Sequence, residues 1–242
     1  MSVQQEKFTE IANAIRSKLG TAEKIKPNDF ADKIGQIQAG SGDFMDLYQD
    51  YGNRTDYNQG FASPCWNNVT LIPKYDIKPV NAGYLFRYCA FSGDLAKHFE
   101  DLGVSVSLAN NVGAPAQVFR EMPNVTRLFE VDVSKFGSLN YWYEKCPNLE
   151  TIDLIKLNDT GNTTFSNTFS GCAKLANIRF GGFIGTDISF ADCPLLSGES
   201  VDNIIAHLKP GVSGKSITFH KDIALDFYQE SEITNAGWDI VQ

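Results

Sequence analysis

The five cysteines of this chain are the residues with the widest chemical range, because a thiol can ligate a metal, form a disulfide or act as a nucleophile. The 242-residue sequence has no Cys-x-x-Cys pair, and its three histidines are scattered without metal-ligand spacing. The odd number of cysteines argues against a closed set of disulfides. Four of the five lie at or beside a recurrent apolar position, so we interpret them as small buried side chains.

This recurrent position belongs to a short phrase: an aromatic residue, two residues, a cysteine or methionine anchor, two more residues and an aliphatic one. The anchors at 122, 146, 172 and 193 are 24, 26 and 21 residues apart, and such a period is typical of a solenoid. Cys65 is a weaker first copy, and Phe86-x-x-Cys89 is an incomplete one. The clear copies are Phe119-x-x-Met122-x-x-Val125, Tyr143-x-x-Cys146-x-x-Leu149, Phe169-x-x-Cys172-x-x-Leu175 and Phe190-x-x-Cys193-x-x-Leu196.

The residues that follow each anchor predict a short strand. In 146–154 and 172–180 the apolar positions end in a period-2 alternation, so Leu154 and Phe180 are both expected in the core. One repeat cannot bury its own apolar face, whereas several in series can. We therefore expect an α+β solenoid over residues 86–198, a stack of short parallel strands in which the aromatic rings of successive copies also stack. The longer gap after Cys89 predicts a helix over 93–101.

Other segments surround this repeat region. Residues 1–38 are expected to form a helical hairpin, whose first helix places Ile11 and Ile15 on one apolar face. That face is too small to be stable alone, so it must pack on the rest of the chain, a second copy or a partner. Residues 39–43 are a Gly/Ser linker, and residues 44–85 are the expected N-terminal cap of the solenoid.

Residues 199–242 are the expected C-terminal cap. A helix at 200–208 has Ser197 or Ser200 as its cap, and strands are predicted at 216–220 and 236–241. A short helix is also predicted between Ile223 and Glu230. Together these elements are expected to close the open end of the sheet.

Charge and composition exclude several classes of function. The formal net charge of −8 argues against a nucleic-acid partner. No apolar run is long enough to span a membrane, and the polar first residues lack a signal-peptide pattern. No nucleophile elbow, P-loop or HExxH motif is present, so we expect no enzymatic activity, cofactor or metal. A glycosidase with two carboxylates stays open as an alternative.

A binding surface, if there is one, is expected on the strands. Outward side chains that alternate with buried ones would align across stacked strands into an array of charges and hydrogen-bonding groups. The competing interpretation is that each is an ordinary solvated strand residue. The candidate binding residues are Thr126, Arg127, Glu150, Thr151, Asp153, Asn177 and Arg179.

The repeat phrase F-x-x-C-x-x-L-x-x-I-x-[LF] resembles the BspA-type (treponemal) leucine-rich repeat, and TFSGCAKLANIRF at 168–180 is close to its usual form. Residues 8–37 resemble an N-terminal module of tail and other structural proteins in phages and prophages of gut Firmicutes. The C-terminal run resembles an ending shared by many such proteins, although Ala236 stands where lysine is common before Gly237 and Trp238. The resemblance implies a right-handed leucine-rich-repeat stack in a phage or prophage virion-associated protein.

This resemblance implies a non-enzymatic recognition or adhesion module that binds a protein or a cell-surface glycan. Residues 1–38 would then contact a second copy or another virion protein. The expected location is the virion, or the bacterial cytoplasm before assembly. The alternatives are a purely structural virion spacer, a bacterial cell-surface adhesin and a glycan-degrading enzyme.

Overall fold

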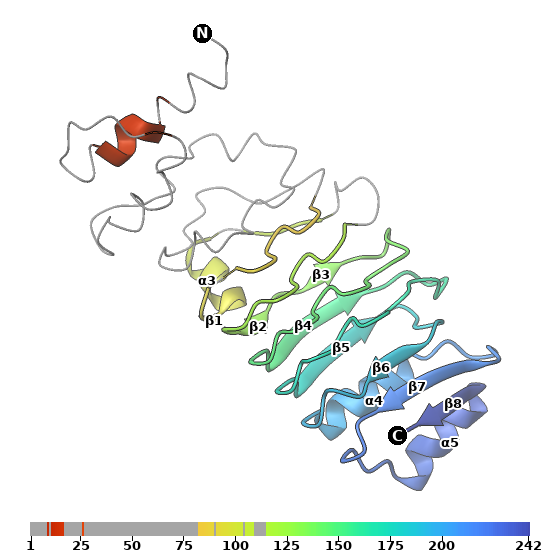
Figure 1. Cartoon of the computed structure of the whole chain (residues 1–242). Helices are drawn as coiled ribbons and strands as arrows, with labels where there is room; N and C mark the ends of the chain where they lie inside the picture. Colours follow the sequence, from red (N-terminus) through yellow and green to blue (C-terminus); the bar gives the residue numbers. More distant parts are fainter. Residues whose placement is uncertain are drawn as a thin grey trace.

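Figure 1 shows the computed structural model of the chain, which describes residues 9, 11–16, 26, 82–89, 91–103, 105–108 and 115–242. The fold is a mixture of α and β structure, with parallel strands in two sheets that are not closed into a barrel. The elements are β1 (Gly93–Asp94), α3 (Leu95–Asp101), β2 (Val125–Leu128), β3 (Val131–Asp132), β4 (Thr151–Lys156), β5 (Asn177–Gly181), β6 (Ile188–Phe190), α4 (Gly198–Ala206), β7 (Lys215–Phe219), α5 (Phe227–Asn235) and β8 (Trp238–Val241).

Every strand pairing between these elements is parallel, as the repeat predicts. In the first sheet β4 lies in the centre, with β5 on one side and β2 and β3 on the other, and β1 pairs with β2. The second sheet has the order β6-β7-β8. Equivalent residues of successive copies thus lie side by side, and Figure 1 shows the strands following one another along the molecule in chain order.

The register of β4 shifts within the strand, and this corrects one prediction. Ile152 pairs with Ile178, but Ile155 rather than Leu154 pairs with Phe180. Leu154 is only half-buried, whereas Ile155 is fully buried. The prediction that Leu154 is a core residue was wrong, because β4 has one more residue than β5 between these two pairs.

The aromatic residues of the phrase form one continuous stack of rings, as predicted. Neighbouring rings lie 4.9–6.2 Å apart at interplanar angles of 3–18°. The stack extends beyond the last predicted copy, because Phe219 of β7 packs on Phe190 of β6. Repeat packing therefore continues past residue 198, into the segment predicted as a cap. The stacked rings are Phe86, Phe119, Tyr143, Phe169, Phe190 and Phe219.

The anchor cysteines are buried and reduced, as predicted for the four that the structure describes. Each of three thiols donates a hydrogen bond to the carbonyl of the aromatic residue one copy earlier. The sulfur–oxygen distances are 3.1 Å from Cys146, 3.0 Å from Cys172 and 3.7 Å from Cys193. Burial raises the pKa of Cys146 and that of Cys193 to about 12, so both thiols are neutral at neutral pH. These thiols connect successive copies and are poor nucleophiles.

Helix α4 covers the edge of the first sheet and accepts hydrogen bonds from backbone N–H groups of β5. Ser197 caps the helix, as predicted, and accepts a hydrogen bond from the backbone of Ser200. The side chains of Ser200 and Asn203 accept hydrogen bonds from the backbone N–H groups of Ile178 and Phe180, at 3.0 and 2.7 Å. Covering a free edge in this way prevents further strand pairing there.

The last helix begins later than predicted. Asp226 and Gln229 form a capping box, in which each side chain accepts a hydrogen bond from the backbone of the other. The helix therefore spans Phe227–Asn235, so the predicted helix exists but its predicted bounds, 223–230, were wrong. The predicted strands at 216–220 and 236–241 correspond to β7 and β8.

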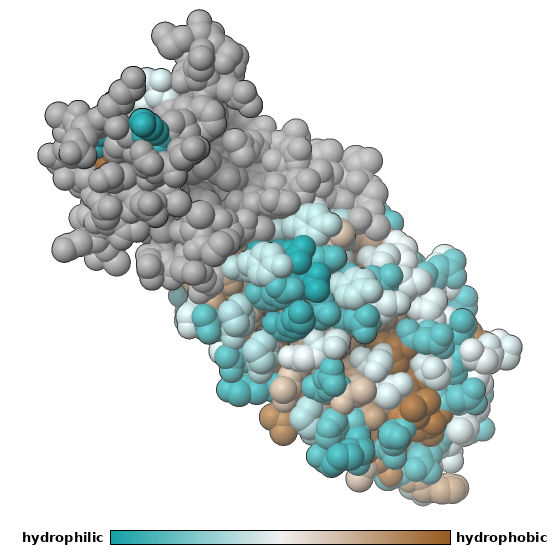
Figure 2. Space-filling view, viewed as in Figure 1, coloured by the Kyte–Doolittle hydropathy of each residue, from teal (hydrophilic) through white to brown (hydrophobic). Residues whose placement is uncertain are grey.

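The structure describes only some of the residues that the N-terminal predictions concern. Residues 9 and 11–16 are helical, with Ile15 buried and Ile11 half-buried. The rest of the hairpin over 1–38, the linker over 39–43, Cys65 and nearly all of the cap over 44–85 lie outside the described residues. The helix predicted over 93–101 is α3, which begins two residues later because Asp94 is its N-cap. None of the helices in the described ranges is long and apolar enough to cross a bilayer. Figure 2 shows hydrophilic residues over much of the described surface in view and hydrophobic residues mainly toward the C-terminal end.

Tyr143 provides a test of the ring stack. Its hydroxyl is buried and has no hydrogen-bond partner among the described residues. We expect Tyr143→Phe to raise the free energy of unfolding by about 1 kcal/mol, because it removes an unsatisfied buried polar group and keeps the ring. Urea denaturation monitored by circular dichroism measures the change. The reverse substitution Phe169→Tyr serves as control and should be destabilising. A less stable Tyr143→Phe protein would mean that the hydroxyl has a partner.

Candidate functional site

The predicted binding residues lie on β2, β4 and β5 and at their starts. Thr126 and Arg127 are on β2, Thr151 and Asp153 on β4, and Asn177 and Arg179 on β5, while Glu150 directly precedes β4. All seven side chains are exposed or half-buried, and the buried Ile152 and Ile178 separate Thr151 from Asp153 and Asn177 from Arg179. We call this surface the strand face and define it by these seven residues together with Asp94 of β1.

Charged side chains of opposite sign form a row across the strand face. The guanidinium of Arg127 donates two hydrogen bonds to Asp153, at 2.8 and 3.1 Å, and lies 3.5 Å from the carboxylate of Asp94. Arg179 donates to the backbone carbonyl of Asp153 at 3.2 Å. The row Asp94–Arg127–Asp153–Arg179 thus joins four adjacent strands. Asp94 was missed from the sequence because it was assigned to a helix.

The remaining strand-face residues flank this row. Thr151 is in register with Arg127 on one side and Asn177 on the other. Thr126 and Glu150 lie on neighbouring copies, where the backbone N–H of Glu150 donates to the carbonyl of Thr126 at 2.8 Å. The structure thus brings all seven predicted residues onto adjacent strands, but only Arg127, Asp153 and Arg179 interact in the charged row.

The row is held only weakly. The hydrogen bond that Arg127 donates to the Asp153 carboxylate raises the pKa of Arg127 above its ordinary value. The side chains of Arg127 and Asp153 are 44% and 24% exposed, and a surface pair of this kind contributes about 0–1 kcal/mol to stability. A ligand can therefore exchange its own polar groups for these contacts at little energetic cost.

A second surface lies over the turns that contain the stacked rings. In each of four copies the residues two before and two after the ring have positive φ, between 53° and 74°. The turns are joined from copy to copy by backbone hydrogen bonds, such as Glu121 N to Glu144 O at 2.8 Å. We call this surface the turn face. The left-handed pairs are Tyr84 and Tyr88, Gln117 and Glu121, Tyr141 and Lys145, and Asn167 and Gly171.

An ion-pair cluster lies at the centre of the turn face. Arg120 contacts the carboxylates of Glu121, at 3.2 Å, and Glu144. Glu121 also lies 3.8 Å from both Arg87 and Lys145. Sequence reasoning missed this cluster, although a signal was present: the residue pairs that directly follow each ring are Arg-Tyr, Arg-Glu and Glu-Lys.

Exposed tyrosines border this cluster. The guanidinium of Arg87 lies 4.5 Å from the ring centroid of Tyr88, and that of Arg120 lies 5.7 Å from that of Tyr141. Such cation–π contacts hold the arginines against the rings. Because the arginines and glutamates of the cluster are largely buried and mutually paired, it is held more firmly than the strand-face row. We interpret it as a structural network.

Neither face contains a metal-binding constellation. Over the ranges that the structure describes, no group of three or more His, Cys, Asp or Glu side chains is placed to hold a metal ion. Comparisons with protein-family models, curated proteins and solved structures found no match for this chain. The geometry of the strand face and the sequence resemblance are therefore the grounds for a proposed function.

Proposed function

We propose that the chain is a non-enzymatic recognition or adhesion module whose stacked parallel strands are a BspA-type leucine-rich-repeat solenoid. The recurring phrase, the continuous ring stack and the parallel register support this assignment. We further propose that the module belongs to a phage or prophage virion, in its tail, and binds a protein or a cell-surface glycan. The sequence resemblance supports this virion role.

The charged row of the strand face is the main structural support for the proposed recognition function. Parallel strands lie about 4.8 Å apart, so equivalent positions present polar groups at a regular spacing. Here acidic and basic groups alternate from Asp94 to Arg179, and Thr151 and Asn177 add hydrogen-bonding groups beside them. A surface of this kind suits an extended ligand with closely spaced hydroxyl, amide or charged groups.

The proposal also assigns a role to residues 1–38 and a location to the protein. A hairpin with one small apolar face is suited to assembly with a second copy or another virion protein. The chain would occupy the bacterial cytoplasm before assembly and the virion afterwards. A location on the virion would place the strand face where it can meet the surface of a host cell.

The proposal is tested by binding of the purified chain to host cells and to isolated cell-wall glycans. We expect Arg127→Ala to weaken binding about tenfold while changing stability by less than about 1 kcal/mol. Lys156→Ala is the matched control, because it removes an exposed ion pair with Asp132 on the same sheet but outside the row. Thermal unfolding of both variants checks that each is folded.

Two outcomes would contradict recognition by the strand face. One is equal binding by the two variants, and the other is no binding by the unaltered chain across relevant strains. Incorporation into particles without binding would favour the structural spacer instead. Cells treated with protease and cells stripped of surface glycan distinguish a protein ligand from a glycan ligand.

A further inference from the structure

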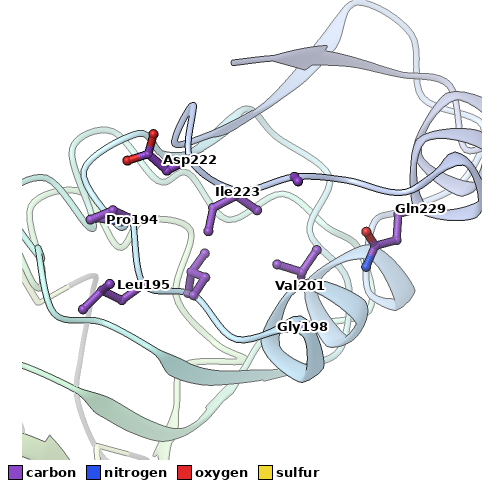
Figure 3. Close-up of a pocket in the computed structure, with 9 residues that line it drawn as sticks. Pro194, Leu195, Gly198, Val201, Asp222, Ile223 and Gln229 are labelled. Carbon is purple, nitrogen blue, oxygen red and sulfur yellow. The ribbon is translucent and has the colours of Figure 1, made fainter.

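A pocket of about 280 Å³ lies near the C-terminal end of the fold, and Figure 3 shows the residues that line it. Pro194 and Leu195 lie on one side of it, Asp222 and Ile223 on another, and Gln229 of α5 at the end farthest from Pro194. The pocket shares no lining residue with the strand face. Its lining residues are Pro194, Leu195, Leu196, Gly198, Val201, Asp222, Ile223, Ala224 and Gln229.

The pocket lies where the last copy of the repeat has its apolar anchor one residue later than the copies before it. Phe219 continues the ring stack on Phe190, with centroids 6.2 Å apart. Three residues after Phe190 comes Cys193, which is fully buried, but three residues after Phe219 comes Asp222, whose side chain is 57% exposed. A carboxylate cannot take the place of a buried thiol without a large desolvation cost. Ile223 is buried instead, and its backbone N–H donates to the carbonyl of His220 at 2.8 Å, as that of Cys193 does to Phe190. Asp222 is thereby left exposed in the lining of the pocket, opposite Pro194 and Leu195.

The surroundings of the pocket are acidic. Residues 187–242 contain nine Asp or Glu and three Lys, a net charge of −6 out of −8 for the chain. Asp222 lines the pocket, and Asp202 accepts a hydrogen bond from Gln229 at 2.7 Å. Lys221 contacts Asp222 at 2.6 Å but is itself 77% exposed, so it is easily displaced.

Some exposed apolar side chains line the pocket, and others belong to residues next to a lining residue in the sequence. Leu195 is 57% exposed, and Phe227 and Tyr228, which directly precede Gln229, are 76% and 77% exposed. Large apolar side chains grouped at the surface commonly mark an interaction site. Ligand pockets for small molecules occupy about 300–1,000 Å³, so this smaller space suits one or two side chains of a polypeptide.

We propose that the pocket docks a basic peptide segment, with an aliphatic side chain between Leu195 and Ile223 and an adjacent Lys or Arg paired with Asp222. The exposed side chain of Leu195 contacts the aliphatic group, and the carboxylates of Asp222 and Asp202 favour the positive charge. The peptide cation takes the position of Lys221 at the Asp222 carboxylate. This second contact goes beyond recognition by the strand face and does not depend on it.

Fluorescence anisotropy of the full chain tests the docking with nine-residue labelled peptides at low salt. The centre of each peptide is Arg-Leu-Arg, Arg-Ala-Arg or Glu-Leu-Glu, between Gly and Ser residues. We expect the first to bind with a dissociation constant of about 10–100 μM and the other two at least about tenfold more weakly. Equal binding of all three, or no binding of the first, would overturn the proposal.

Two variants that act on the pocket differently make the test independent of folding defects. Asp222→Asn removes the lining charge and keeps the size of the side chain, while Ala224→Trp should fill the pocket from an exposed position. Both are expected to lose peptide binding. The charge control Asp239→Asn changes an exposed carboxylate of β8 outside the lining and should bind normally. Unchanged binding by folded Ala224→Trp protein would also overturn the proposal, and none of these outcomes bears on the strand face.

Discussion

Cys172→Asp is expected to lower the free energy of unfolding by about 3–5 kcal/mol at pH 7, because it leaves an unpaired charge in the core. Cys172 is fully buried, and its thiol donates to the carbonyl of Tyr143 at 3.0 Å. An ionised carboxylate has no proton to donate and would face that carbonyl oxygen. Burial already raises the pKa of the Cys172 thiol well above its ordinary value, so this site disfavours any negative charge.

The same substitution should show a characteristic pH dependence. Burial raises the pKa of the introduced carboxyl in the folded state above its unfolded value of about 3.9. The folded state then favours the protonated form, so the loss of stability grows as the pH rises above the unfolded pKa. The stability difference from the wild type should therefore be smaller at pH 4 than at pH 7.

Ala173→Asp is the matched control, because Ala173 follows Cys172 directly and is exposed. Its carboxylate stays hydrated, so the change should be within about 0.5 kcal/mol. Urea denaturation of both variants at the two pH values measures the effects. Similar stability of the two variants at pH 7 would mean that the cysteine is not a buried anchor.

Gly182→Ala should cost about 2–4 kcal/mol through backbone strain and a steric clash. Gly182 has a φ of +79°, and an added Cβ would lie 2.4 Å from the carbonyl oxygen of Leu157 on the preceding copy. Neighbouring backbone hydrogen bonds, from Leu157 to Gly181 at 2.7 Å and from Phe183 to Asn158 at 3.1 Å, hold the two copies together at this point. The clash cannot be relieved without separating them.

Gly137→Ala is the comparison, because nothing lies within 4 Å of its added Cβ and its φ is not positive. We expect this variant to be as stable as the wild type, or more stable by about 0.4–1 kcal/mol, since alanine restricts the unfolded chain. Thermal unfolding of the two variants provides the measurement. Equal melting temperatures would show that the copies do not approach closely at Gly182.

Residue type and spacing were sufficient to predict much of the repeat packing. The aromatic-x-x-Cys phrase identified the buried thiols and the ring stack, because burial selects residue type directly. The period of the anchors predicted parallel strands. Ser197 was expected at the start of α4 because a hydroxyl before an apolar helical pattern is a local signal.

Positions that depend on another part of the chain were harder to predict. Leu154 looked like the equivalent of Phe180, but pairing with β5 makes Ile155 the equivalent. The start of α5 was missed for a different reason, because the prediction did not use the local capping box between Asp226 and Gln229. Of the charged row only Asp94 was missed, since it joins Arg127 through strand pairing across a long insertion.

The sequence by itself determined which side chains of each copy are buried and therefore that the copies stack. Only the tertiary structure decided which exposed groups of different copies meet. The copies differ in length, because their anchors are 24, 26 and 21 residues apart. The spacing in the sequence therefore does not specify which residues of the neighbouring strands lie beside an exposed residue. The register between strands pairs Arg127 with Thr151 and so brings its guanidinium within hydrogen-bonding distance of Asp153. The shift of the last anchor to Ile223 leaves Asp222 exposed in the pocket beside Leu195.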